Sequence, residues 1–208
     1  MLSRALAAQW RSRSGRPAVT AAELAKPSFL VEIVVSSGEE IEQRLAEQGL
    51  APEEIVLKYC WPRYAPRAGS GIRVISKFES LGQQFERLIA MHRVVQSAIP
   101  MPVGVVKSSE GEFVGYVLEY AEGDTLEALL GLGLLDEAER RLAIVEETLE
   151  KLHAKSIAHG DVNPSNVIAA DDGRTLLIDP IPVPGSGARL QDELCVAEIR
   201  GRIDALRA

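Results

Sequence analysis

A polar segment set between apolar elements in the second half of the chain limits the choice of fold more than any other stretch. It runs His159-Gly-Asp-Val-Asn-Pro-Ser-Asn166, and a further aspartate, Asp179, follows the apolar run Leu176–Ile178. Before it, apolar residues recur at helical spacing from Ala138 to Leu152, which predicts a helix. After it, two short apolar segments flank an Asp-Asp-Gly turn. The polar residues are therefore expected in one loop between a helix and a hairpin.

These side chains have the chemistry that phosphoryl transfer from ATP requires. The triphosphate is a poor leaving system until Mg²⁺ neutralises it, so carboxylate and amide oxygens must hold the metal. A further carboxylate must orient the acceptor hydroxyl and take its proton. Asp161 can act as this base, while Asn166 and Asp179 can hold the metal. The alternative is a polar loop without a catalytic role, in which Asp179 only caps a strand.

The chain resembles the protein kinase superfamily over residues 30–195. His159, Asp161, Asn166 and Asp179 match the family pattern H-x-D-x-x-x-x-N followed by an aspartate, residue by residue. The loop reads HGD rather than HRD, Asp179-Pro-Ile replaces DFG, and no APE segment follows. This form is typical of RIO-like kinases, the small kinase of the KEOPS complex, lipopolysaccharide kinases and aminoglycoside phosphotransferases.

The resemblance implies an α+β fold of two lobes, protein kinase-like, with a β-rich N-lobe and a truncated α-helical C-lobe. The expected division is a basic arm over residues 1–27, the N-lobe over 28–120 and the C-lobe over 121–208.

The sequence predicts an N-lobe made mainly of strands with one inserted helix. The helix is indicated by apolar residues at helical spacing from Phe85 to His92, whereas Glu39–Gly49 fits either a strand or a short helix. The expected strands are Phe29–Val35, Ile55–Tyr59 and a hairpin formed by Val103–Val106 and Phe113–Tyr120. In the C-lobe, a final helix is expected from Gln191 onward.

The resemblance also requires a lysine that contacts the triphosphate and pairs with a glutamate of the inserted helix. Glu86 is the expected glutamate. Lys58 and Lys77 compete for the lysine position, and Lys58 is preferred because 28 residues separate it from Glu86. Lys77 lies only 9 residues before Glu86, which leaves little chain for a strand, a turn and a helix start.

The remaining nucleotide contacts follow from the resemblance alone. Gly38, which lies 20 residues before Lys58, is the expected glycine of a hairpin that covers the phosphates. The segment Val117–Asp124 is similar to the hinge, which implies that backbone groups at Glu119 and Ala121 bind adenine.

Composition excludes several classes of protein. A net charge of −7 argues against a general nucleic-acid binder, although residues 1–22 contain four arginines and no acid. Two distant cysteines, Cys60 and Cys195, exclude a disulfide scaffold and fit the cytoplasm. The longest apolar stretch, Ala128–Leu135, is far shorter than the roughly 20 residues of a membrane span. The basic start leaves an organelle-targeted form or a secreted effector open.

The predicted function is that of an ATP- and Mg²⁺-dependent phosphotransferase, a minimal atypical serine/threonine protein kinase. Its phosphate acceptor would be a hydroxyl of a protein substrate. A small-molecule kinase acting on lipopolysaccharide, sugars or aminoglycosides and a non-catalytic pseudokinase remain as alternatives. The resemblance also allows for an activating protein partner, for which the loop Trp61–Gly71 is the candidate contact.

Two further residues are expected to support the loop. Asp192 lies 13 residues after Asp179, where related folds have an aspartate that holds the catalytic loop. His159 is expected to brace the loop and not to transfer protons.

Overall fold

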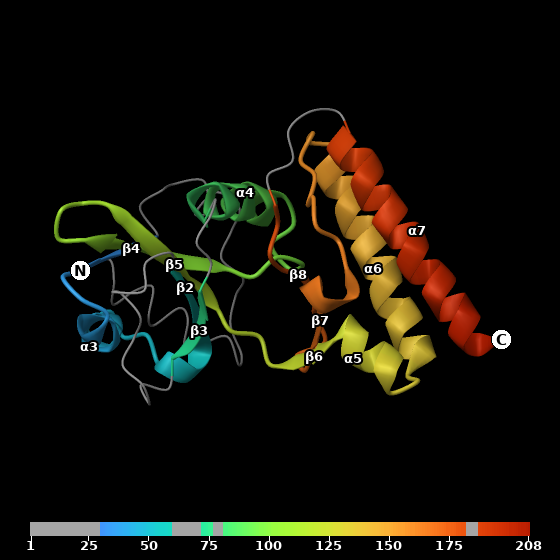
Figure 1. Ribbon diagram of the computed structural model, residues 1–208, viewed down its shortest axis with the longest axis horizontal. Coiled ribbons are helices and arrows are strands. Elements are labelled where there is room, and N and C mark those ends of the chain that lie inside the picture. Colours follow the sequence, from blue (N-terminus) through green and yellow to red (C-terminus); the bar gives the residue numbers. More distant parts are fainter. Residues whose placement is uncertain (1–29, 60–71, 77–80, 182–186) are drawn as a thin grey trace. The chain divides into compact units, whose positions relative to one another are not determined.

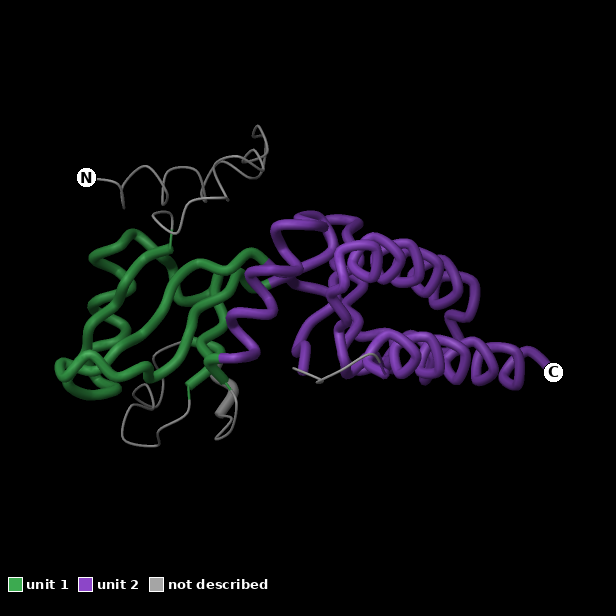
Figure 2. Tube along the Cα trace, turned by 90° about the horizontal axis from the view of Figure 1, so that it is seen from above, with its two compact units in different colours: residues 1–82, 101–120 green, residues 83–100, 121–208 purple. Residues whose placement is uncertain are grey.

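The computed structural model describes residues 30–59, 72–76, 81–181 and 187–208 (Figure 1). They fall into two compact units with an α+β fold (Figure 2). Unit 1 extends to Gly82 and includes Met101–Tyr120, whereas unit 2 comprises Gln83–Pro100 and Ala121–Ala208. Residues 83–100, which the sequence assigns to the N-lobe, thus belong to unit 2. The expected basic arm, the loop 61–71 and Lys77 lie outside the described residues.

Unit 1 contains a five-stranded mixed sheet with the strand order β1-β4-β5-β2-β3. Both β4 and β2 are antiparallel to β5, while β1 is parallel to β4 and β3 is parallel to β2. The apolar residues of β1 alternate between buried and exposed positions, as expected for a strand with one covered face. The strands are β1 (Val31–Val35), β2 (Ile55–Tyr59), β3 (Arg73–Ser76), β4 (Pro102–Ser108) and β5 (Phe113–Glu119).

The segment that fitted either a strand or a helix forms a helix, α3 (Glu39–Glu47). Ile41 and Leu45 lie four residues apart and are fully buried, which gives α3 one apolar face against the sheet core. The expectation of a single inserted helix in the first half was therefore wrong. Because α3 connects β1 to β2, these strands form no hairpin, and β1 pairs with β4 instead.

Two helices of unit 2 lie side by side, α6 (Leu135–His153) and α7 (Gly187–Arg207) (Figure 1). The helix predicted over 138–152 is confirmed, and the expected final helix begins four residues earlier than Gln191. Leu142, Val145, Leu149 and Leu152 are buried on α6, as the spacing predicts, and Val196, Ile199 and Ile203 are buried on α7.

A small antiparallel sheet completes unit 2, with the order β6-β7-β8. The hairpin expected after the polar loop is confirmed as β7 (Val167–Ala170) and β8 (Thr175–Leu177). The sequence gave no signal for β6 (Gly123–Thr125) or for the short helix α5 (Leu126–Gly131). Thr125 begins α5 as its N-cap, and its hydroxyl accepts the Ala128 N–H at 3.2 Å.

The inserted helix is confirmed as α4 (Leu81–Val94). The Arg87 guanidinium donates to the Ala158 carbonyl at 2.5 Å, and the Leu177 N–H donates to the Ala98 carbonyl at 2.8 Å. These bonds join the α4 region to the loop after α6 and to β8. They explain why residues 83–100 group with unit 2. Among the described helices, none combines the length and apolar character that a membrane crossing requires.

Candidate active site

Asp192 on α7 holds the start of the polar loop. Its carboxylate is fully buried and accepts the N–H groups of His159 and Gly160, both at 2.8 Å. A third contact comes from His153 at the end of α6, whose Nε2 lies 2.9 Å from Asp192 Oδ2. Gly160 has φ of 87°, a left-handed conformation that side chains other than glycine adopt at a cost. This backbone geometry accounts for glycine in the HGD sequence.

His159 connects the loop to the end of β8. Its Nδ1 accepts the Asp161 N–H at 3.3 Å, so the proton is on Nε2, which donates to the Ile178 carbonyl at 2.9 Å. Burial lowers the pKa of His159 to about 4, and the nearby Asp192 carboxylate only partly offsets this effect. A neutral, fully buried imidazole with both nitrogens engaged acts as a brace.

The depressed pKa of His159 predicts that acid destabilises the fold. In the unfolded chain the imidazole takes up a proton near its ordinary pKa of 6.5, whereas the folded protein resists protonation down to about pH 4. The unfolded state binds more protons in this window, so the free energy of unfolding falls as the pH falls through it. The stabilisation is complete above pH 6.5, and up to about 3 kcal/mol of it is lost by pH 4.

Urea unfolding followed from about pH 7 to about pH 4.5 measures this loss. His159→Asn removes the titrating group, so we expect the variant to be less stable at neutral pH but to lose less stability on acidification. An equal slope in the two proteins would contradict the assignment to His159.

Asp161 and Asn166 are brought into direct contact. The Asn166 side-chain Nδ2 donates to Asp161 Oδ2 at 2.8 Å and to the Asp161 carbonyl at 2.9 Å. The half-buried Asp161 carboxylate is therefore held in one orientation. Because both Asn166 amide protons are directed at Asp161, its Oδ1 is the atom suited to ligate a cation.

Asn163 is a site residue that our sequence reasoning missed. Its Nδ2 donates to Asp161 Oδ1 at 3.2 Å, while its Oδ1 accepts the N–H groups of Ser165 and Asn166. These bonds cap the short 3₁₀ turn η4 (Pro164–Asn166). An asparagine directly before a proline is a signal for such a cap, and could have found it.

Asp179 lies at the same end of the β7–β8 hairpin as Asn166. The Ile178 N–H donates to the Asn166 carbonyl at 2.9 Å, and the Ile181 N–H donates to the His159 carbonyl at 2.9 Å. Asp179 lies between these two anchors with φ of 59°, a strained conformation for a residue with a side chain. Its Oδ1 is buried. Strain of this kind concentrates at functional sites.

The donor set at this end of the hairpin suits Mg²⁺. Within the part of the chain that the structure describes, no group of three or more His, Cys, Asp or Glu side chains is placed to hold a metal. One carboxylate and one amide oxygen, from Asp179 and Asn166, match the preference of Mg²⁺ for few protein ligands completed by water and phosphate oxygens.

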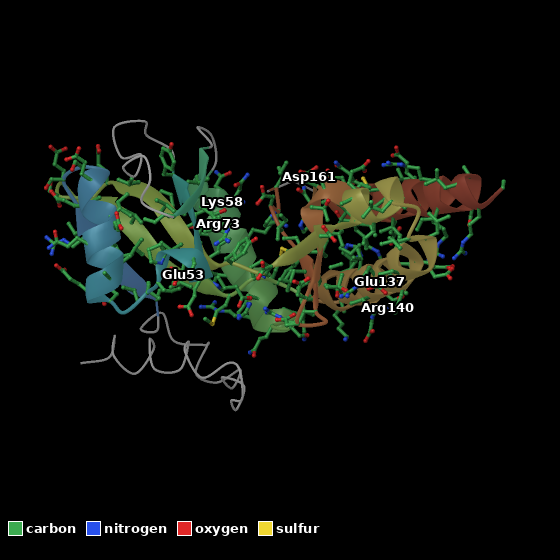
Figure 3. The ribbon with its side chains drawn as sticks, turned by 90° about the horizontal axis from the view of Figure 1, so that it is seen from below. Glu53, Lys58, Arg73, Glu137, Arg140 and Asp161 are labelled. Carbon is green, nitrogen blue, oxygen red and sulfur yellow. The ribbon has the colours of Figure 1, made fainter. Side chains whose placement is uncertain are left out.

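The predicted lysine and glutamate lie in different units. Lys58 is 2% exposed on β2, where it is paired with Tyr116 of β5 (Figure 3). The close approach of β2 and β5 requires Gly115, since a Cβ there would lie 2.1 Å from the Lys58 carbonyl oxygen. Glu86 is exposed on α4 in unit 2. The pairing of Lys58 with Glu86 stays a prediction.

Gly38 does not lie in a hairpin turn, which corrects the expectation from the sequence. It is the N-cap of α3 with φ of −65°, a conformation that any residue adopts. The first turn of α3 carries Glu39, Glu40 and Glu42. Three carboxylates offset the attraction of a helix N-terminus for phosphate.

The proposed hinge begins at the end of β5. The buried Glu119 carboxylate accepts the Met101 N–H at 3.0 Å, and the Glu119 N–H donates to the Met101 carbonyl at 3.0 Å. Next to it, the Arg73 guanidinium lies 3.5 Å from the Tyr120 ring centroid, a cation–π contact that the sequence did not indicate. Ala121 is the first residue of the second unit-2 segment.

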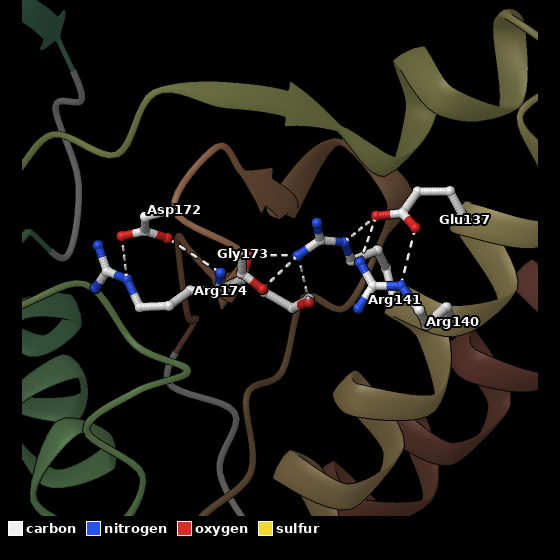
Figure 4. Close-up of polar contacts among 7 residues, drawn as sticks. Glu137, Arg140, Arg141, Asp172, Gly173 and Arg174 are labelled. Carbon is white, nitrogen blue, oxygen red and sulfur yellow. Dashed lines mark hydrogen bonds and ion pairs between the residues drawn. The ribbon is translucent and has the colours of Figure 1, made fainter.

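Arg141 fixes the far end of the hairpin (Figure 4). Its side chain is 6% exposed and donates to the carbonyls of Gly173 and Arg174 and to the Thr175 hydroxyl. Its Nε also binds Glu137, whose pKa is lowered to about 2 by hydrogen bonds from Arg140 and Arg141. Arg141 thus ties α6 to the β7–β8 turn, opposite the end with Asn166 and Asp179.

Comparison with curated proteins finds two similar segments, both in Arabidopsis thaliana. They belong to "Probable serine/threonine protein kinase IRE", 42% identical over 66 residues, and "Probable serine/threonine protein kinase IREH1", 41% identical over 66 residues. Each match covers 30% of this chain. The chain spans only 6% and 5% of the lengths of these proteins. No protein-family model matches the chain. A short part of the chain is therefore similar to serine/threonine protein kinases.

Proposed function

We propose that this chain is an ATP- and Mg²⁺-dependent phosphotransferase that acts on a hydroxyl group, and that the hydroxyl belongs to a serine or threonine of a protein. The observation that carries this proposal is the orientation of the Asp161 carboxylate by Asn163 and Asn166, next to the strained Asp179. The similarity of a short segment to named serine/threonine protein kinases supports the choice of acceptor.

In this proposal Asp161 is the catalytic base. Each of its carboxylate oxygens accepts one amide proton, at 3.2 and 2.8 Å, and retains a lone pair for the proton of the acceptor hydroxyl. The same bonds fix the direction in which the hydroxyl is oriented. Asn166 Oδ1 and the Asp179 carboxylate would hold Mg²⁺, which supplies charge neutralisation as the γ-phosphoryl group leaves ATP.

The remaining nucleotide contacts also belong to the proposal. Lys58 would contact the α- and β-phosphates, with Glu86 as its partner, and backbone groups at Glu119 and Ala121 would bind the adenine edge. The place of Lys58 on the strand next to β5 supports its role, because β5 leads directly to the proposed hinge. Gly38 is left out because of the carboxylates that follow it.

Transfer of labelled γ-phosphate from Mg·ATP to a basic protein acceptor tests the proposal, alongside nucleotide binding measured by calorimetry. We expect Mg²⁺-dependent incorporation into serine or threonine. Asp179→Asn should lower the rate by on the order of 10²-fold or more, because it removes the charged metal ligand. Asp172→Asn is the matched control, an exposed aspartate on the turn at the other end of the hairpin.

The two parts of the proposal fail in different ways. Incorporation into sugars or aminoglycosides but not into protein would overturn the protein acceptor and keep the phosphotransferase. Nucleotide binding without transfer to any hydroxyl acceptor would leave a pseudokinase. Absence of nucleotide binding would overturn the proposal as a whole.

A further inference from the structure

The outer face of α7 is apolar and exposed. Leu190 and Leu194 are 57% and 61% exposed, although they lie one turn apart on a helix whose other face packs in unit 2. Ala197 and Gly201 continue the same face at spacings of three and four residues, and both are exposed. We call these four residues the α7 stripe. Large exposed apolar side chains that adjoin each other on one helix face indicate an interaction surface.

The α7 stripe is complementary to itself when two helices run antiparallel. A two-fold axis near Val196 places Leu190 opposite Gly201 of the partner subunit. The same axis places Leu194 opposite Ala197 of the partner subunit. Each large side chain thus meets a small residue, which lets the helices approach closely. The space above Gly201 is open, because an added Cβ there would meet nothing within 4 Å.

Charges beside the α7 stripe favour the same orientation. Arg189, Glu193, Arg200 and Asp204 follow one flank of the stripe at helical spacing. In the antiparallel arrangement, Arg189 faces Asp204 of the partner subunit and Glu193 faces Arg200 of the partner subunit. A parallel arrangement would instead bring like charges together.

These ion pairs add to contacts that exist within one chain. Arg189 binds Glu193 at 2.7 Å and Arg200 binds Glu146 at 2.6 Å. A guanidinium has five N–H donors, so it can bind a second carboxylate without losing the first. On the other flank, Gln191 faces Glu198 of the partner subunit, which introduces no repulsion.

We propose that this chain forms an antiparallel homodimer through the α7 stripe. The occupant of the stripe is the same helix of a second copy, because the order of large and small residues and the order of charges are both matched by the two-fold operation. The proposal is independent of the phosphotransferase activity.

Sedimentation of the full chain at concentrations up to about 100 µM tests the dimer. We expect the mass of two chains for the unmodified protein and of one chain for Leu194→Glu, since the glutamate would be buried against an apolar partner. Leu132→Glu is the control, because Leu132 is 68% exposed and lies outside α7, so this variant should remain dimeric. A single-chain mass for the unmodified protein, or a dimeric Leu194→Glu, would overturn the proposal.

Two further variants test the geometry. Arg189→Glu and Asp204→Arg should each weaken self-association by about tenfold, and an equimolar mixture of the two should regain it as a heterodimer. Gly201→Leu adds apolar surface in open space, so nonspecific association would increase. In the proposed dimer it collides with Leu190 of the partner subunit, and we expect a single-chain mass. Stronger association of Gly201→Leu, or no gain on mixing, would overturn the antiparallel register.

Discussion

Asp161→Asn is expected to lower the rate of phosphoryl transfer by about 10²- to 10⁴-fold, the range that a positioned general base contributes. The amide has the shape of the carboxylate but cannot take the proton of the acceptor hydroxyl. It also opposes donor to donor at one of the two contacts, since Asn163 Nδ2 and Asn166 Nδ2 each donate to a different Asp161 oxygen. The effect should therefore fall on kcat, with little change in the binding of Mg·ATP.

Initial rates with labelled ATP, measured at saturating acceptor, give this value. Asp172→Asn serves again as the control, because it makes the same chemical change on an exposed aspartate. The free energy of unfolding should change little in Asp161→Asn, since Asp161 is half-buried and its neighbours stay capped by Asn163. A rate equal to that of the unmodified protein would remove Asp161 from the role of base.

Asp192→Asn should lower the free energy of unfolding by about 3 kcal/mol, the largest effect on stability that we expect at the site. The Asp192 carboxylate is fully buried and accepts three hydrogen bonds, divided between its two oxygens. In asparagine one oxygen becomes an NH₂ group, which then faces either the Gly160 N–H or the His159 and His153 nitrogens. A buried donor is left without an acceptor in both orientations.

Urea unfolding at neutral pH measures the loss, and hydrogen exchange locates it. The amides of His159 and Gly160 should exchange faster in Asp192→Asn, because their acceptor is weakened while α6 and α7 remain packed. Asp172→Asn, on the exposed turn, should leave both measurements within about 0.5 kcal/mol of the unmodified protein. Unchanged exchange at these two amides would contradict the role of Asp192 as the support of the loop.

Local patterns were sufficient for several elements of the fold. The apolar spacing from Ala138 to Leu152 predicted the core of α6, and the β-branched run Ile55–Tyr59 predicted β2 with the bounds observed. The polar loop and its hairpin were located because turn residues separate short apolar segments. In all these cases the signal lies within one helical or strand period, so neighbours along the chain determine the structure.

Other elements depended on partners far away in the sequence. Glu39–Gly49 fitted two kinds of structure until the sheet buried Ile41 and Leu45 on one side of a helix. β1 pairs with β4, which lies about 70 residues later, and not with β2. β6 is a strand only because it pairs with β7, since its Gly-Asp-Thr sequence has little strand propensity of its own.

For the candidate site, the sequence by itself determined which residues have the chemistry of phosphoryl transfer: Asp161, Asn166 and Asp179 in one loop and hairpin. Tertiary structure alone decided how they are held. Asp192 reaches the loop from α7, Arg141 reaches the β7–β8 turn from α6, and both are separated from their partners by about 30 residues. The identity of a reactive group is written in its side chain, whereas its orientation depends on buried hydrogen bonds that form only when distant helices pack together.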